Sequence, residues 1–317
     1  MLKSKKKVAS KGPKLEQIKT LRQELKKWKT WVPPGHFYSP IPSPTDIARE
    51  VSILNVEDES HIPGIELQTQ HQLKLLRSFR PLCKQLWIPE FPTPHHRFHF
   101  NNEFFSYADA ISLYCMMKRQ QPRRIVEVGS GFSSALMLDI LDREPTTKLQ
   151  LTFIEPYPDR IISLLQHADL KRVNLIQKPV QDIPIKTFTS LDDGDILFID
   201  GSHISKAGSD VNFLIFEVLP RLKNGVFVHF HDVFFPFSYP KEWLNSGVAW
   251  NEAYLLRAFL QYNPCFKIEF FVSYLVEKHR SKVAKFLPAM LKSELRPLSQ
   301  QSNSPGASLW LRKYPVR

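Results

Sequence analysis

Hydrophobic residues change their spacing at about residue 124. From Arg124 onward, short runs rich in β-branched and aromatic residues alternate with helical patterns. This alternation predicts a parallel sheet covered by helices. The runs that we expect to form strands are residues 124–128, 149–155, 173–177, 195–200, 225–231, 266–272 and 308–313. Seven such runs fit one doubly wound α/β sheet, in which ligands bind beyond the carboxyl ends of the strands.

The chain before residue 120 has a different pattern. Residues 31–45 contain five prolines and no charged residue, so we expect an extended connector there. Short helical patterns broken by prolines follow over residues 46–100, and a helical pattern runs from Tyr107 to Arg119. We therefore predict a helical arm over residues 1–30, a proline-rich cap over residues 31–120 and an α/β ligand-binding domain over residues 121–317.

Positive charge is concentrated in the arm. Residues 1–30 carry eleven basic and two acidic groups, hence +9 of the formal net charge of +12. Hydrophobic side chains recur at helical spacing among these lysines: Leu15, Ile18, Leu21, Leu25 and Trp28. This pattern predicts a helix that docks on the rest of the chain with its lysines in solvent; binding to an anionic membrane surface or an acidic partner is the alternative. The near-neutral remainder makes nucleic acid an unfavoured partner.

Composition excludes several other classes. No uncharged apolar stretch approaches the roughly 18 to 20 residues of a membrane span, and no apolar segment follows the basic N-terminus as in a signal peptide. We therefore expect a cytoplasmic protein. The three cysteines form no C-x-x-C pair, which argues against a disulfide scaffold or a thiolate zinc site.

A glycine turn follows the first predicted strand. The segment reads Glu127, Val128, Gly129, Ser130, Gly131 and then a helical pattern. Gly129 permits the tight turn from strand to helix, and Gly131 lets the backbone approach a ligand closely. A dinucleotide fingerprint calls for Gly or Ala at position 134, where this chain has serine, so a nicotinamide cofactor is disfavoured.

Acidic and amide groups follow the next two strands. Glu155 ends the second strand, where a carboxylate can accept hydrogen bonds from both hydroxyls of a ribose. Gln181 and Asp182 follow the third strand, where the edge of an adenine would lie. An acid at a strand end is often a helix cap, so the order of the three elements carries more weight than any one of them.

The succession of motifs resembles the class I S-adenosylmethionine-dependent methyltransferases. It comprises EVGSG, FIEP, Gln181 with Asp182, IDGSH, and HD after the fifth strand. The branch with these last two motifs often occurs among uncharacterised and sugar-modifying O-methyltransferases. The resemblance implies a Rossmann-like, mostly parallel sheet of order 3-2-1-4-5-7-6 and S-adenosylmethionine as cofactor. It implies cofactor-binding residues as follows: Glu127, Gly129, Ser130 and Gly131 at the methionine part, Glu155 at the ribose, Gln181 and Asp182 at the adenine, and also Ser133 and Asp200.

Candidate catalytic groups follow the fourth and fifth strands. Asp200 and His203 lie at the end of the fourth strand, and His231 and Asp232 at the end of the fifth. In one interpretation Asp200, His231 and Asp232 hold Mg²⁺ or Mn²⁺ and His203 is the general base. This is similar to the metal-dependent catechol O-methyltransferases, except that histidine replaces the lysine base and one ligand. In the other interpretation there is no metal, and a histidine paired with a carboxylate, His203 or His231, deprotonates the acceptor.

An aromatic loop follows Asp232 and predicts the wall of the acceptor site. Tyr239, Trp250 and Asn251 are the candidate substrate residues; the aromatic ones could stack on a sugar or ring, or form a lid that excludes water. We expect O-methylation of a hydroxyl on a small molecule or glycan. The alternatives are a nucleic-acid methyltransferase, a metal-dependent hydroxylase of the same fold, and a non-catalytic cofactor-binding scaffold.

Overall fold

The computed structural model describes residues 18, 20, 31–54, 61–105, 107–143, 148–292 and 306–315. The chain divides into two compact units, Met1–Asp46 and Ile47–Arg317. The predicted basic helix lies outside the described residues, apart from Ile18 and Thr20, which are helical and exposed. The proposed division at residues 30 and 120 stays a prediction. In the described part of the chain, no helix is both long and apolar enough to cross a membrane.

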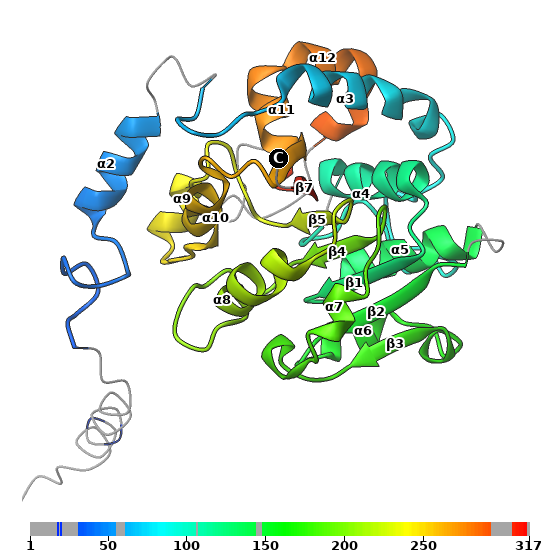
Figure 1. Ribbon diagram of the computed structural model, residues 1–317, viewed down its shortest axis with the longest axis horizontal. Helices are drawn as coiled ribbons and strands as arrows, with labels where there is room; N and C mark the ends of the chain where they lie inside the picture. Colours follow the sequence, from blue (N-terminus) through cyan, green and yellow to red (C-terminus); the bar gives the residue numbers. More distant parts are fainter. Residues whose placement is uncertain are drawn as a thin grey trace, which may run out of the picture. The chain divides into compact units, whose positions relative to one another are not determined.

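The second unit is built on one seven-stranded sheet (Figure 1). Its strands are β1 (Arg124–Val128), β2 (Gln150–Ile154), β3 (Val173–Ile176), β4 (Ile196–Ile199), β5 (Phe227–Phe230), β6 (Phe266–Phe271) and β7 (Leu309–Lys313). Their order is β3-β2-β1-β4-β5-β7-β6, with β7 antiparallel to both of its neighbours and the other pairs parallel. The predicted α/β class, the strand positions and the strand order are thus confirmed.

The central strands are apolar because helices cover both faces of the sheet. Every residue of β4 and of β5 is buried, as expected for parallel strands between two helical layers. The core includes the fully buried aromatic side chains of Phe153, Phe198 and Trp310. This burial fixes the strand tips, and hence the loops that follow them, in a rigid frame.

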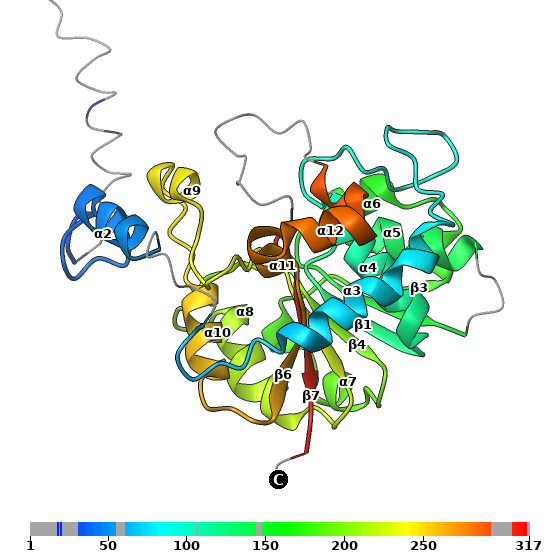
Figure 2. The same cartoon turned by 90° about the horizontal axis from the view of Figure 1, so that it is seen from above.

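Helices cover the sheet in two layers (Figures 1 and 2). On one face α3 (Thr69–Cys83) contacts α4 (Tyr107–Gln120) and α12 (Arg280–Phe286), and α4 in turn contacts α5 (Phe132–Arg143) and α11 (Val272–Lys278). The other face carries α7 (Lys186–Thr189) and α8 (Asp210–Phe213). The remaining helices are α2 (Pro44–Leu54), α6 (Asp159–Leu164), α9 (Lys241–Asn245) and α10 (Glu252–Leu260).

A buried arginine ties the segment before α4 to this frame. The Arg97 guanidinium lies 2.7 Å from carboxylate oxygens of Asp139, Asp142 and Asp169. Its side chain is 2% exposed, and a buried charge of this kind is tolerated only when it is paired. The segment from Arg97 to α4 is therefore anchored on α5 and on the loop before β3, which places the following residues beside the end of β1.

The turn after β1 leaves no room for a side chain at Gly129. Its φ is +81°, and a Cβ there would lie 1.7 Å from the backbone oxygen of Asp200. Gly247 also has a positive φ, +88°, but a Cβ at that position would meet no atom within 4 Å. Gly247→Ala therefore measures the cost of the backbone conformation without the cost of a steric collision. We expect Gly129→Ala to lower the free energy of unfolding by at least about 3 kcal/mol, against about 1 kcal/mol for Gly247→Ala. Chemical denaturation measures both; equal losses would contradict the steric argument.

Candidate active site

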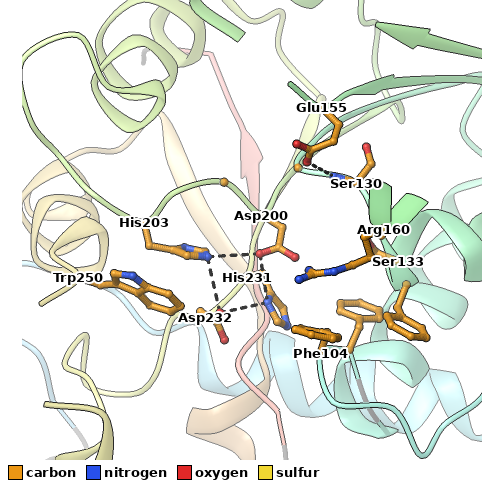
Figure 3. A pocket seen from close by; sticks show the side chains of 15 residues that line it. Phe104, Ser130, Ser133, Glu155, Arg160, Asp200, His203, His231, Asp232 and Trp250 are labelled. Atoms are coloured by element: carbon orange, nitrogen blue, oxygen red, sulfur yellow. Dashed lines mark hydrogen bonds and ion pairs between the residues drawn. The ribbon is translucent and has the colours of Figure 1, made fainter. Parts of the chain in front are cut away.

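A pocket of about 350 Å³ opens at the carboxyl ends of β1, β4 and β5 (Figure 3). Ten of the residues predicted from the sequence line it: Gly129, Ser130, Gly131, Ser133, Glu155, Asp200, His203, His231, Asp232 and Trp250. Five predicted residues do not line it: Glu127, Gln181, Asp182, Tyr239 and Asn251. The pocket also has lining residues that the sequence did not single out: Phe104, Phe105, Phe132, Arg160 and Gly201.

One end of the pocket is formed by the glycine turn and Glu155. The Ser130 backbone N–H donates to Glu155 Oε2 at 3.1 Å, and the Tyr157 N–H donates to Oε1 at 2.8 Å. These bonds fix the carboxylate at the tip of β2, and its remaining lone pairs can accept from a ligand. The Ser130 hydroxyl is buried and has no hydrogen-bond partner among the residues described, so a ligand could also satisfy it.

Glu127 supports this turn from behind rather than facing the pocket. It is fully buried, and the hydroxyls of Ser133 and Ser134 both donate to its carboxyl group. Burial raises the pKa of Glu127 to about 8, although the two hydroxyls act in the opposite direction. Glu127 therefore fixes the start of α5. Its predicted contact with the methionine part of a cofactor stays a prediction, because it does not line the pocket in this structure.

Gln181 and Asp182 lie in a short 3₁₀ helix away from the pocket. The Gln181 amide donates to the backbone oxygen of Gly208 at 2.7 Å. This bond links the segment after β3 to the loop before α8. Their role at an adenine stays a prediction, because neither residue lines the pocket in this structure.

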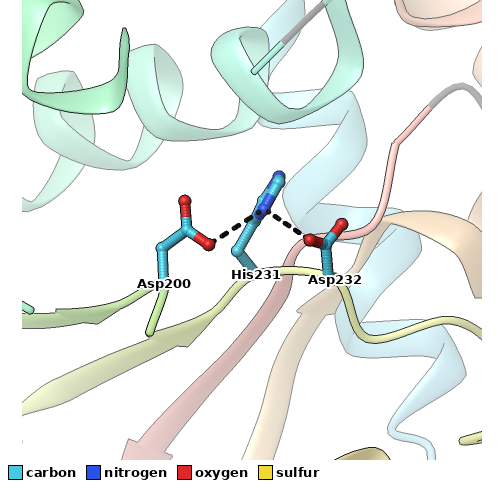
Figure 4. A group of neighbouring side chains, drawn as sticks. All are labelled: Asp200, His231 and Asp232. Atoms are coloured by element: carbon cyan, nitrogen blue, oxygen red, sulfur yellow. Dashed lines mark ion pairs between the residues drawn. The ribbon is translucent and has the colours of Figure 1, made fainter. Parts of the chain in front are cut away.

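The other end of the pocket is a ring of two carboxylates and two imidazoles (Figures 3 and 4). Asp200 Oδ1 lies 3.4 Å from both His203 Nε2 and His231 Nδ1. Asp232 Oδ2 lies 3.6 Å from His203 Nε2 and 3.5 Å from His231 Nδ1. The carboxylates and imidazoles thus alternate, so that each negative group has a neighbouring group that can be positive.

Two members of the ring have an unusual backbone conformation. His203 and Asp232 have φ values of +58° and +56°, in the left-handed region that favours glycine. Such a conformation costs about 1 kcal/mol or more for another residue and is concentrated at functional sites. Both residues follow a strand of the sheet, and both line the pocket.

A buried carboxylate lies behind each imidazole. His203 Nδ1 is 2.9 Å from Glu252 Oε2 at the start of α10, and His231 Nε2 is 3.6 Å from Asp109 Oδ2 in α4. Asp109 is itself fixed, because its Oδ1 accepts from the backbone N–H groups of Ala307 and Ser308. The sequence contained one signal of this arrangement: Asp109 is the one acidic residue of α4, whose residues before Lys118 are otherwise mostly apolar.

These neighbours control protonation within the ring. Burial favours the neutral imidazole, but the carboxylates of Asp200, Glu252 and Asp232 outweigh it and raise the pKa of His203 to about 10. The pKa of His231 is likewise raised well above its usual value, against burial, by Asp232, Asp200 and Asp109. In turn the two imidazoles hold the pKa of Asp200 and of Asp232 below the usual range despite burial. With no cation bound, the ring therefore balances two anions with two cations.

Trp250 is the substrate candidate that reaches the pocket. Its ring lies against His203, with centroids 4.3 Å apart. The Tyr239 hydroxyl accepts from the Ala253 N–H at 3.0 Å, and Asn251 Oδ1 accepts from the Ser205 N–H at 2.6 Å. Tyr239 and Asn251 therefore hold the wall in place from outside the pocket. Their predicted contact with substrate stays a prediction, because neither side chain lines the pocket in this structure.

Comparison with known proteins agrees with this geometry. The sequence profile of a family described as "Methyltransferase domain" matches residues 126–233, which span the glycine turn, Glu155 and the whole ring. An uncharacterized protein of Archaeoglobus fulgidus is 35% identical over 171 residues, which cover 52% of this chain and 75% of that protein.

Two solved methyltransferases are similar to this chain at low identity and low TM-score. The S-adenosylhomocysteine-bound methyltransferase PaMTH1 of Podospora anserina is 17% identical, with a TM-score of 0.38, over 87% of this chain and 99% of that one. The O-methyltransferase TomG of Streptomyces achromogenes, in complex with S-adenosylmethionine, is 14% identical, with a TM-score of 0.39, over 84% and 95% of the two chains. The match over residues 126–233 is the finding that identifies a methyltransferase domain in this chain.

The raised pKa of Glu127 predicts a pH-dependent stability. A carboxyl group with a pKa of about 8 in the folded state and an ordinary value of 4.5 holds its proton more tightly when folded. Its stabilising contribution is complete below about pH 4.5 and is lost as the pH rises through 8. We expect the unfolding temperature of the wild type to fall relative to Glu127→Gln, by about 5 °C or more, between pH 5 and pH 9. Parallel pH profiles for the two proteins would show that Glu127 is ionised throughout.

Proposed function

The chain belongs to the class I S-adenosylmethionine-dependent methyltransferases, and from this premise we propose that it methylates a hydroxyl group of a small molecule or glycan. The observation that supports this acceptor is the ring of Asp200, His203, His231 and Asp232 beside the glycine turn. A hydroxyl must lose its proton during methyl transfer, which calls for a base or a cation at the reacting oxygen. The ring offers groups for both.

The cofactor binds, in this proposal, along the turn after β1. Glu155 would accept hydrogen bonds from the ribose hydroxyls, since its carboxylate is fixed by two backbone N–H groups and faces the pocket. Gly129 and Gly131 let the backbone approach the rest of the molecule. The tips of β1 and β4 touch at Gly129 and Asp200, so a cofactor held at the turn would be next to the ring.

His203 is the residue that we assign as the base. A proton on its Nδ1 donates to Glu252, which leaves Nε2 directed at Asp200 and Asp232. Because its raised pKa keeps His203 protonated near neutral pH, His203 can act as a base only in its neutral form, in which the Nε2 lone pair of the imidazole accepts the proton of the acceptor hydroxyl. Bound S-adenosylmethionine would supply the methyl group for an in-line displacement by the acceptor oxygen, with a neutral thioether as the leaving group.

The donor set of the ring fits a divalent cation. One donor atom each from Asp200, His231 and Asp232 lies within 4.8 Å of the others (Figure 4). Two carboxylate oxygens suit Mg²⁺ and Mn²⁺, and the imidazole nitrogen favours Mn²⁺. We propose that these three residues hold such an ion, which when bound supplies the charge that lowers the pKa of the acceptor hydroxyl.

The acceptor lies against an aromatic wall in this proposal. Trp250 packs on His203 on one side, and Phe105 lies 5.2 Å from the His231 ring on the other. Flat apolar surfaces of this kind stack on the faces of sugars and phenols. A hydroxyl on such an acceptor would lie between the two histidines.

Substitutions at the two ends of the pocket should have separable effects. We expect Glu155→Ala to raise the dissociation constant of S-adenosylmethionine about 100-fold, because two hydrogen bonds to a charged group are lost. His203→Gln should leave that constant nearly unchanged but slow methyl transfer at least about 100-fold. Calorimetry gives the first quantity, and labelled methyl transfer to a panel of monosaccharides, glycosides and phenols gives the second.

The matched control is Asp159→Ala, which removes an exposed acid four residues after Glu155 and outside the pocket. It should change neither quantity. Transfer only to amines or nucleic acid would contradict hydroxyl methylation, and absence of S-adenosylmethionine binding to the wild type would contradict the cofactor site.

Cation binding should release protons from the ring. His231 must lose a proton to bind a metal through Nδ1, and an ion between the aspartates offsets the charge that keeps His203 protonated. We expect Mn²⁺ to release about one to two protons per ion at pH 7, measured by calorimetry in two buffers of different ionisation enthalpy.

Asp232→Asn should weaken Mn²⁺ binding at least about tenfold and reduce the proton release, whereas Asp159→Asn should change neither. Unaltered Mn²⁺ affinity in Asp232→Asn would show that the ion binds elsewhere.

A further inference from the structure

One permanent positive charge in the pocket has no acidic partner. Arg160 is the only lysine or arginine among the lining residues that the structure describes. Across those same residues no carboxylate forms an ion pair with its guanidinium, in contrast to Arg97, Arg124 and Arg172. The other charged group at the cofactor end is the acid Glu155. The guanidinium of Arg160 is therefore available to bind an anionic group of a ligand.

The position of Arg160 is determined by the glycine turn and an aromatic pair. It is the second residue of α6, five residues after Glu155. Its Cδ passes 3.1 Å from the place where a Cβ on Gly131 would lie, so a side chain at that position would displace it. The guanidinium lies 3.8 Å from the centroid of the Phe104 ring, and that ring stacks on Phe132.

The Phe104 ring restricts the positions that the Arg160 guanidinium can occupy. A guanidinium over an aromatic face keeps its N–H groups at the edge free for hydrogen bonds, while the ring excludes water from one side. In Figure 3 the guanidinium extends from the wall of the pocket toward its interior, between Phe104 and Asp200. An anion at this point would also lie near the N-terminus of α5, which begins at Phe132 and favours negative charge.

S-adenosylmethionine carries one anionic group, the carboxylate of its amino-acid part. We propose that Arg160, held by Phe104, binds this carboxylate and so sets the position of the amino-acid part over the glycine turn. The inference rests on the cofactor site proposed above. It adds a residue from the helix after β2 to a site otherwise formed by β1, β2 and β4.

Decarboxylated S-adenosylmethionine tests this assignment, because it lacks only the carboxylate. Calorimetry on the full chain gives the ratio of its dissociation constant to that of S-adenosylmethionine. We expect a ratio of about 10 to 100 for the wild type, which is the range for a charge-assisted bidentate contact. In Arg160→Gln the ratio should fall to within about threefold of unity, because S-adenosylmethionine weakens while the decarboxylated compound does not.

Three further variants separate position from charge. Arg160→Lys keeps the charge without the planar fork and should give an intermediate ratio. Phe104→Leu removes the supporting ring and should lower the ratio while Arg160 is intact. Arg123→Gln, an exposed arginine at the opposite end of β1, should leave the ratio unchanged.

Two results would overturn the proposal. Equal weakening of both compounds by Arg160→Gln would indicate a general structural role, and an unchanged affinity for both would show that the guanidinium serves another anion, such as an acidic group on the acceptor. If the wild type binds neither compound, the cofactor site itself fails, and this inference fails with it.

Discussion

Two aspartates held a few ångströms apart in a buried pocket are the constraint on which the rest of this site depends. Asp200 and Asp232 can both be ionised there only because His203 and His231 lie between them. Each imidazole in turn requires a carboxylate behind it, which α10 and α4 supply. The left-handed backbone at His203 and Asp232 is a local cost of bringing these groups together.

The same constraint joins the cofactor end of the pocket to the reactive end. A side chain at Gly129 would collide with the backbone of Asp200, so the turn that receives the cofactor and the strand tip that carries the ring are in direct contact. Glu155 is fixed to this turn through Ser130. A methyl donor on the turn and an acceptor at the ring would therefore be adjacent without any large movement of the sheet.

The segment before the sheet completes the pocket from the outside. Arg97 anchors it through three aspartates, and the residues that follow bring Phe104 and Phe105 to the pocket wall. Phe104 supports Arg160, and Phe105 lies beside His231. This N-terminal segment thus adds two aromatic side chains to a pocket wall that also includes Phe132 and Trp250.

The sequence by itself determined the parallel sheet and the edge at which Asp200, His203, His231 and Asp232 lie, because the carboxyl ends of parallel strands share one edge. That the fourth and fifth strands are neighbours was implied by the resemblance to the methyltransferases. Tertiary structure decided the rest. In the folded chain, Gln181, Tyr239 and Asn251 form hydrogen bonds with backbone groups outside the pocket. Tertiary structure also brought Asp109, Arg160 and Glu252 to the site. These three lie in helices, and which residues a helical side chain meets depends on how the helix packs against distant strands, which local spacing does not specify.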